Sequence, residues 1–290
     1  PILTFFESWA AATAFTLQLY FDFSGYSDMA IGLGLLFGIS LPLNFNSPFK
    51  STNISIFWRN WHMTLSEFIR NYIYVPLSLS LSRFGITNNL NSLYFFLISI
   101  VIPIFFSYFL IGIWHGAGWN FILFGLLHAC FLLIQISWKN LLNFFSYYNK
   151  IRGKKIYRIL SQLLTFISVI GAFVLFRAEN IETAKNIYYS MMGFNKIDLP
   201  YYFFPDLQPW LMEFNFNFDG FQKNSSINAP IIATHIIVLI IIVMFFPNTI
   251  EIMRNYIDDK DHLNIINKKS FIIWKPNFLW GIIIAIMFFF

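Results

Sequence analysis

Histidine is the residue type in this sequence that is best able to do chemistry. Two of the five histidines lie in tryptophan-rich motifs: His115 in W-H-G-A-G-W (Trp114–Trp119) and His62 in F-W-R-N-W-H (Phe57–His62). An imidazole with a pKa near neutrality can take a proton from an attacking hydroxyl, which is the central requirement of acyl transfer. The sequence contains no H-E-x-x-H, no pair of cysteines and no Gly-rich phosphate loop with a lysine. We therefore expect neither a metal site nor a tightly bound cofactor.

Each histidine also has a structural interpretation. His115 can be a helix-end histidine bonded to a carbonyl, but an ionisable group in apolar surroundings is costly, which favours a functional role. For His62, anchoring at the membrane interface and a role in chemistry stay equally open. His128, in F-G-L-L-H-A, is expected to make a structural interhelical hydrogen bond, and His235 and His262 are expected to be incidental.

The acidic candidates are Asp22 and Asp28, which lie in Y-F-D-F-S-G-Y-S-D. In an apolar protein these carboxylates either line a polar interior or pair with Arg59 or Arg70.

The composition identifies the kind of protein in which these residues act. The chain of 290 residues is 57% hydrophobic and 21% aromatic, and only 11% of its residues are charged. Because so few charged residues cannot cover the surface of a soluble globular protein of this length, we expect an integral membrane protein. The pI of about 9.2 could suggest a nucleic-acid partner. The basic residues, however, cluster in short loops between apolar segments, as orientation signals do, and we expect a bilayer and no nucleic acid.

The elements that must position the histidines are membrane helices. A spanning helix needs about 20 mostly apolar residues, and the segments that fit are Ile2–Tyr20, Tyr26–Leu43, Asn91–Ile113, Trp119–Trp138, Ile156–Phe176, Pro230–Phe246 and the start of a last one, Asn277–Phe290. Pro103 should kink its helix. Asn53–Leu81 is too polar to span and suits an interfacial or re-entrant helix. The glycines around His115 permit close backbone approach.

Charge in the loops predicts the orientation. Lys139–Arg158 contains lysines and arginines without any acid, which is typical of a cytoplasmic loop. Arg177–Ala229 is richer in acids than in bases, and should form an outer loop that begins with an amphipathic helix, Ile181–Met192. Followed along the chain, this orientation places His115 towards the outer side and His62 towards the inner side.

Five blocks of sequence resemble a known family. They are Tyr20–Gly32, Asn44–Phe49 (N-F-N-S-P-F), Phe57–Ser66, Arg70–Leu77 and Trp114–Ala129, in that order. Together they resemble the membrane-bound O-acyltransferase (MBOAT) family, within it the bacterial branch of alginate and peptidoglycan O-acetyltransferase membrane subunits. The likeness covers about Tyr20–Met192. It implies an all-α, polytopic fold with helices and re-entrant segments around a central tunnel. Residues 1–290 would then be a single membrane domain, the C-terminal portion of a longer protein, without its N-terminal helices.

The resemblance also implies an activity. His115 would be the catalytic histidine, His62 the second motif histidine, Arg59 and Arg70 contacts for donor phosphates, with Trp114, Asp22 and Asp28 as further substrate-binding candidates. The donor would be acetyl-CoA, and the acceptor an exported or cell-wall polysaccharide of alginate or peptidoglycan type. The acceptor would be reached through a periplasmic or extracellular acetyltransferase partner.

The resemblance places the protein in the bacterial inner membrane and leaves two alternatives open. One is D-alanyl transfer to teichoic acid from a carrier protein, and the other, outside the family, is a multi-pass transporter. Asn71 stands where relatives often carry an aspartate, so a role for an acid at that position is not expected here.

Overall fold

Helices form almost all of the protein. The computed structural model describes residues 3–145, 147–195, 197–200, 212, 217–220, 229–256 and 272–289. Among these residues the strands are β1 (Asp198–Pro200) and β2 (Asn217–Gly220), which pair in parallel. Part of the sequence expected to form the outer loop, and His262, lie outside the described residues. The helical class predicted from the sequence agrees with this architecture.

The first helix differs from the prediction. We expected two spans, Ile2–Tyr20 and Tyr26–Leu43, with a polar break between them, and this is wrong: α1 (Phe5–Leu36) is one continuous helix of 32 residues. A single Gly25 costs an α-helix only about 1 kcal/mol, and packing of α1 against later helices offsets that cost. The helix ends where Gly38 takes a positive φ of 70°, a conformation that suits glycine.

Within the described ranges, three helical segments are long and apolar enough to cross a membrane: Ser92–His115, Trp119–Phe144 and Lys155–Arg177. They confirm the spans predicted from residue 91 to residue 176. The apolar helix α12 (Ala229–Phe245) and the helix α15 (Phe278–Phe289) also form where expected, but are shorter. α1 is not among the three, because Glu7, Gln18, Asp22 and Asp28 lower its mean hydropathy.

The span around Pro103 contains a π-helical turn. It consists of α5 (Ser92–Phe96), the π turn η3 (Leu97–Val101) and α6 (Ile102–His115). Pro103 cannot donate to the carbonyl four residues before it, Ser99. That carbonyl instead accepts a hydrogen bond of 2.6 Å from the Ser78 hydroxyl. The irregularity expected at Pro103 is therefore a π turn whose freed carbonyl is paired with another helix.

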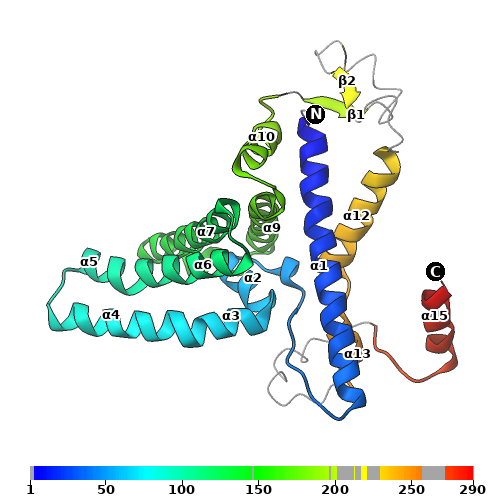
Figure 1. Ribbon diagram of the computed structural model, residues 1–290, viewed down its shortest axis with the longest axis horizontal. Coiled ribbons are helices and arrows are strands. Elements are labelled where there is room, and N and C mark those ends of the chain that lie inside the picture. The colour runs from blue at the N-terminus through cyan, green and yellow to red at the C-terminus, as the bar shows by residue number, and fades with distance from the viewer. Residues whose placement is uncertain are drawn as a thin grey trace.

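The polar segment expected to be one interfacial helix is divided into several. It contains α2 (Ile54–Asn60), α3 (Met63–Ile69), the π turn η2 (Arg70–Tyr74) and α4 (Val75–Thr87), and the 3-10 turn η1 (Pro48–Lys50) precedes it. Figure 1 shows α1 upright with α12 beside it, while α4 and α6 extend away from α1 to one side.

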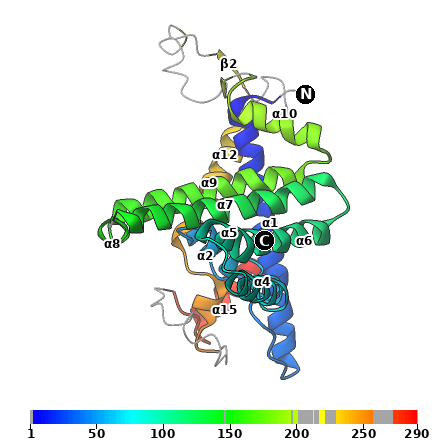
Figure 2. The same ribbon diagram turned by 90° about the vertical axis from the view of Figure 1, so that its left-hand side faces the viewer.

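The remaining helices complete the packing around α7 (Trp119–Phe144) and α9 (Lys155–Arg177), which lie side by side in Figure 2. The short α8 (Tyr148–Ile151) joins them. α10 (Ile181–Met191), the predicted amphipathic helix, packs on α1 and α9, and α13 (Thr249–Met253) follows α12.

The closest helix contact is between α6 and α7. A Cβ built on Gly112 would lie 2.6 Å from the Phe121 carbonyl oxygen, and one built on Gly125 would overlap the Tyr108 carbonyl. Neither position leaves room for a side chain, so the backbones of α6 and α7 are in contact at Gly112 and Gly125. The close approach predicted around His115 is confirmed.

We expect Gly125→Ala to lower the free energy of unfolding by roughly 1–3 kcal/mol, because the new methyl group forces α6 away from α7. Gly171→Ala is the matched control, since Gly171 also lies in a span but has open space around it. Circular dichroism of each detergent-solubilised variant during heating gives its midpoint of thermal unfolding, which is compared with that of the parent protein. Equal midpoints for the two variants would contradict the close approach.

Candidate functional site

His62 sits in a turn that Asn44 and Asn46 hold in place. The residue joins α2 to α3 with φ 44° and ψ 56°, a left-handed conformation that is strained for most side chains. The backbone of Asn46 donates to the Asn60 carbonyl (3.0 Å), and Met63 N–H donates to the Asn44 carbonyl (2.9 Å). The Thr64 hydroxyl donates to the Asn44 side chain at 2.7 Å. Two motifs that are separate in the sequence thus form one structural unit around His62.

The same unit has an aromatic core. Trp61 is buried and stacks on Phe57, with ring centroids 5.5 Å apart, and meets Phe45 edge to face at 5.1 Å. Tyr20 of α1 and Phe173 of α9 contact the same indole. The tryptophan before His62 therefore anchors the turn to α1 and to α9, which are far apart in the sequence.

His115 is the last residue of α6, and its ring lies among aromatic rings. Phe176 of α9 lies 4.9 Å away and Phe124 of α7 lies 5.9 Å away, both edge to face. The buried Asn120 ties the start of α7 to the end of α9 by donating to the carbonyls of Leu175 (3.4 Å) and Ala178 (2.9 Å). These two hydrogen bonds hold the start of α7 and the end of α9 together on either side of the His115 imidazole.

Trp114 connects the two motif histidines. Its ring lies 4.8 Å from the His115 ring and 6.0 Å from the His62 ring, and 61% of the residue is exposed. The ring of Phe23 in α1 also contacts His62, with the two ring centroids 4.8 Å apart. The two imidazoles are near enough for a charge on one to act on the other. His62 and His115 are 53 positions apart in the sequence, but in the structure both rings lie beside the Trp114 indole.

The hydrogen bonding of the histidines differs. His62 Nδ1 is buried without a hydrogen-bond partner in the part of the chain that the structure describes. His128, by contrast, is fully buried in α7, and its Nδ1 accepts a hydrogen bond of 3.2 Å from Trp58 Nε1–H of α2. The interhelical hydrogen bond predicted for His128 is confirmed. His235 is exposed and bonds to the Ile231 carbonyl within its own helix, as expected for an incidental residue.

The charged candidates lie at the surface of this region. Arg59 and Arg70 are exposed, and Arg70 donates to the Asn71 side chain at 3.3 Å. Asp22 is exposed, whereas Asp28 is partly buried against Thr249. Neither aspartate forms an ion pair with either arginine, all four being described residues, so this alternative from the sequence is wrong.

Phe23, Phe176 and Asn120 also belong to this region, although they were not among the candidates from the sequence. Phenylalanine is the commonest aromatic residue in the chain, with 38 copies, so nothing in its local sequence marks the two that contact the imidazoles. The sequence did contain a signal for Asn120, because an amide side chain at the start of an apolar helix must find a hydrogen-bond partner.

These features define a helical membrane protein with a candidate histidine site. Residues 2–177 match the model described as the membrane-bound O-acyltransferase family. The match covers more than half of the chain, so the chain belongs to the MBOAT family. Membership excludes the multi-pass transporter outside the family that the sequence left open.

Several curated proteins are similar to this chain. The peptidoglycan O-acetyltransferase of Helicobacter pylori is 41% identical over 197 residues, which is 68% of this chain and 34% of that protein. The probable alginate O-acetylase AlgI of Azotobacter vinelandii is 36% identical over 188 residues, 65% of this chain and 33% of that protein.

A relative with a different printed activity is also similar. The teichoic acid D-alanyltransferase of Bacillus subtilis is 31% identical over 176 residues, 57% of this chain and 40% of that protein. The aligned region thus spans about a third of the length of the O-acetyltransferase relatives, and somewhat more of the D-alanyltransferase.

We expect Trp58→Phe to lower the free energy of unfolding by roughly 1–3 kcal/mol, because it removes the hydrogen bond to a fully buried imidazole. Trp119→Phe is the control, as Trp119 is 70% exposed. Unfolding of both variants in detergent, compared with the parent protein, measures the difference. If Trp119→Phe lowered the free energy of unfolding as much as Trp58→Phe, the hydrogen bond to His128 would not account for the effect at Trp58.

Burial lowers the pKa of His62 below its ordinary value of 6.5. Below about pH 6.5 the unfolded chain therefore binds a proton that the folded protein does not, and stability is lost as the pH falls through the lowered pKa. We expect His62→Asn to lose less stability than the parent between about pH 7 and pH 5, since asparagine tolerates the left-handed conformation and does not titrate. Unfolding midpoints across this pH range test the expectation, and parallel profiles would contradict it.

Proposed function

We propose that the full-length protein passes an acetyl group from acetyl-CoA across the membrane for O-acetylation of an exported or cell-wall polysaccharide. The family and the O-acetyltransferase relatives support acyl transfer to a hydroxyl. In this proposal the described helices form one wall of a tunnel that is completed by the rest of the protein, and α2 to α4 are its re-entrant segments. The protein would lie in the bacterial inner membrane.

The arrangement of His62, Trp114 and His115 is the observation that supports this function best. His128 is engaged in a hydrogen bond, whereas the two motif histidines meet the same exposed indole and make no hydrogen bond through their rings within the described residues. Two unengaged imidazoles beside an accessible aromatic surface can serve a donor and an acceptor at once.

The proposed reaction needs one proton transfer and one exchange of bonds. His115 takes the proton of the acceptor hydroxyl, and the oxygen attacks the thioester carbonyl. The new C–O bond forms as the C–S bond breaks, and the proton passes from His115 to the departing thiolate. Because burial keeps His62 neutral, it can donate its ring N–H to the thioester carbonyl and stabilise the negative charge that develops there.

The remaining candidates have roles in binding. Arg59 and Arg70 extend from the elements on either side of the His62 turn and are proposed contacts for the donor phosphates. Trp114 would pack against the transferred group, and Asp22 and Asp28 would bind substrate from α1. In this scheme the hydroxyl that His115 deprotonates belongs to the periplasmic or extracellular acetyltransferase, which would then pass the acetyl group from that ester to a hydroxyl of the polysaccharide.

D-alanyl transfer to teichoic acid is the second candidate, because the Bacillus subtilis D-alanyltransferase is also similar to this chain. The two candidates differ in the donor: a soluble thioester for acetyl transfer and a carrier-protein thioester for D-alanyl transfer. Purified full-length protein supplied with each donor separates them.

We expect His115→Ala to reduce alkali-releasable acetate on cell-surface polysaccharide by roughly 100-fold or more, the range of a lost general base. His235→Ala is the matched control, since that histidine is exposed on α12. Acetate is measured in cells that carry each full-length gene at equal membrane abundance. Unchanged acetate in His115→Ala would remove this residue from the reaction, while D-alanine on teichoic acid in place of acetate would favour the second candidate.

A further inference from the structure

A groove lies between α7 and α9, at the end of these helices that is far from His115. Its volume is about 1020 Å³, and it is open along one side. Along α7 its wall runs from Phe131 to Lys139, whereas His115 lies beyond the other end of that helix. At about 1.5 Å per residue, Phe131, the lining residue of α7 nearest to His115, is some 18 Å from the start of α7, and neither motif histidine nor Trp114 lines the groove. The groove is therefore not part of the histidine site.

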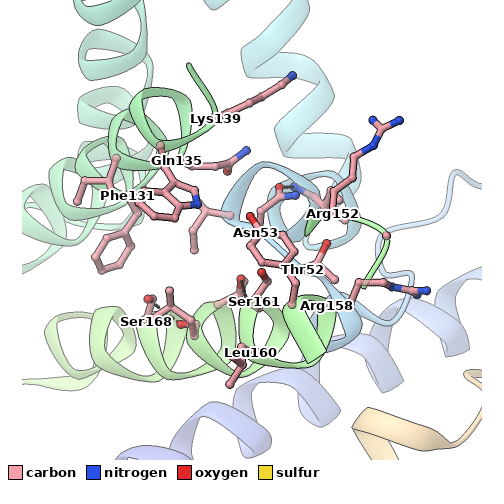
Figure 3. Close-up of a pocket in the computed structure, with 18 residues that line it drawn as sticks. Thr52, Asn53, Phe131, Gln135, Lys139, Arg152, Arg158, Leu160, Ser161 and Ser168 are labelled. Atoms are coloured by element: carbon pink, nitrogen blue, oxygen red, sulfur yellow. Dashed lines mark hydrogen bonds between the residues drawn. The ribbon is translucent and has the colours of Figure 1, made fainter. Parts of the chain in front are cut away.

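The rim of the groove is basic. Lys139, Arg152 and Arg158 line it, and none of the lining residues is acidic. In Figure 3, Arg152 and Arg158 extend from one end of the groove, and Phe131 and Ser168 lie towards the other. A lining with three basic side chains and no acidic one carries a net positive charge, which favours an anionic group at this end.

The interior of the groove is effectively apolar. The hydroxyls of Thr165 and Ser168 donate to the carbonyls of Ser161 (2.7 Å) and Leu164 (2.8 Å) in their own helix. The Gln135 side chain accepts a hydrogen bond from Ser55 N–H at 2.9 Å. These polar groups are already bonded, so what the groove offers to an occupant is mainly hydrocarbon surface.

The depth of the groove matches one leaflet of a bilayer. From Arg158 to Ser168 the wall extends ten positions along α9, or about 15 Å at 1.5 Å per residue. The hydrocarbon core of a bilayer is about 30 Å thick, so one leaflet is about half of that. Leu160 and Leu164, on the same stretch, are 59% and 66% exposed, as expected for side chains that face lipid.

We infer that this groove binds an anionic phospholipid. The headgroup phosphate lies among Lys139, Arg152 and Arg158, and an acyl chain follows α9 towards Ser168. Basic pockets between membrane helices at a basic loop are suited to such headgroups. The acetyl donor fits less well, because its acyl group must reach His115 at the far end of α7. The inference does not depend on the proposed function.

Native mass spectrometry of the full-length protein, mixed with phosphatidylglycerol and phosphatidylcholine of equal chain length, tests the inference. The parent protein is expected to retain phosphatidylglycerol in preference to phosphatidylcholine. The triple variant K139Q/R152Q/R158Q should reduce this preference by roughly 10-fold or more, since each basic group near a membrane surface contributes to anionic lipid binding. K150Q/K154Q/K155Q is the matched control, because it removes as many charges from the same loop at positions that do not line the groove.

A second variant tests the position of the acyl chain. Ser168→Trp fills the deep end and should weaken retention of long-chain phosphatidylglycerol but not of its short-chain form. Equal losses in the two triple variants would mean that loop charge alone attracts the lipid, and would overturn the site. Displacement of the lipid by acetyl-CoA would identify the groove as the route of the donor instead. Absence of lipid selectivity in the parent protein, for example because another part of the chain covers the groove, would also refute the proposal.

Discussion

The close approach of α6 to α7 is the contact on which the described structure depends most. Gly112 and Gly125 bring the two backbones together, and no larger residue fits at either position. Because α6 ends at His115 and α7 begins four residues later, this contact places the imidazole at the point where the hairpin turns. The first turn of α7 then reaches α9 through the amide of Asn120. One backbone contact thus positions both sides of the histidine.

The structure treats its buried histidines in different ways. Burying an imidazole costs free energy unless partners replace water, and His128 meets part of that cost with the indole N–H of Trp58 on its Nδ1, while its Nε2 has no hydrogen-bond partner among the described residues. His62 lacks such a bond, because its Nδ1 has no partner among the described residues. Its turn is held instead by Asn44, which bonds to both residues that follow the histidine. An imidazole that is fixed in place but not bonded is available to a substrate.

The two ends of the α7–α9 pair have different chemistry. One end carries aromatic rings and His115, and the other carries arginines, a lysine and an open apolar groove. Thr165 and Ser168 bond to carbonyls of their own helix and Gln135 accepts from the Ser55 N–H, so these side chains leave a mainly apolar wall. The pair therefore separates the candidate histidine site from the basic groove along the length of its helices.

Composition and motif residues were enough to identify the helical membrane class, the spans from residue 91 to residue 176, the family and the two motif histidines. Such features follow from local hydropathy and from residue types that the chemistry requires. The continuity of α1 across Gly25 was not predictable in the same way, because packing against distant helices decides whether a polar stretch stays helical. Nor did any local signal show that Trp114 lies between His62 and His115, or that Phe23 and Phe176 enclose them. Those contacts join segments far apart in the chain, and only the packing of the folded helices brings them together.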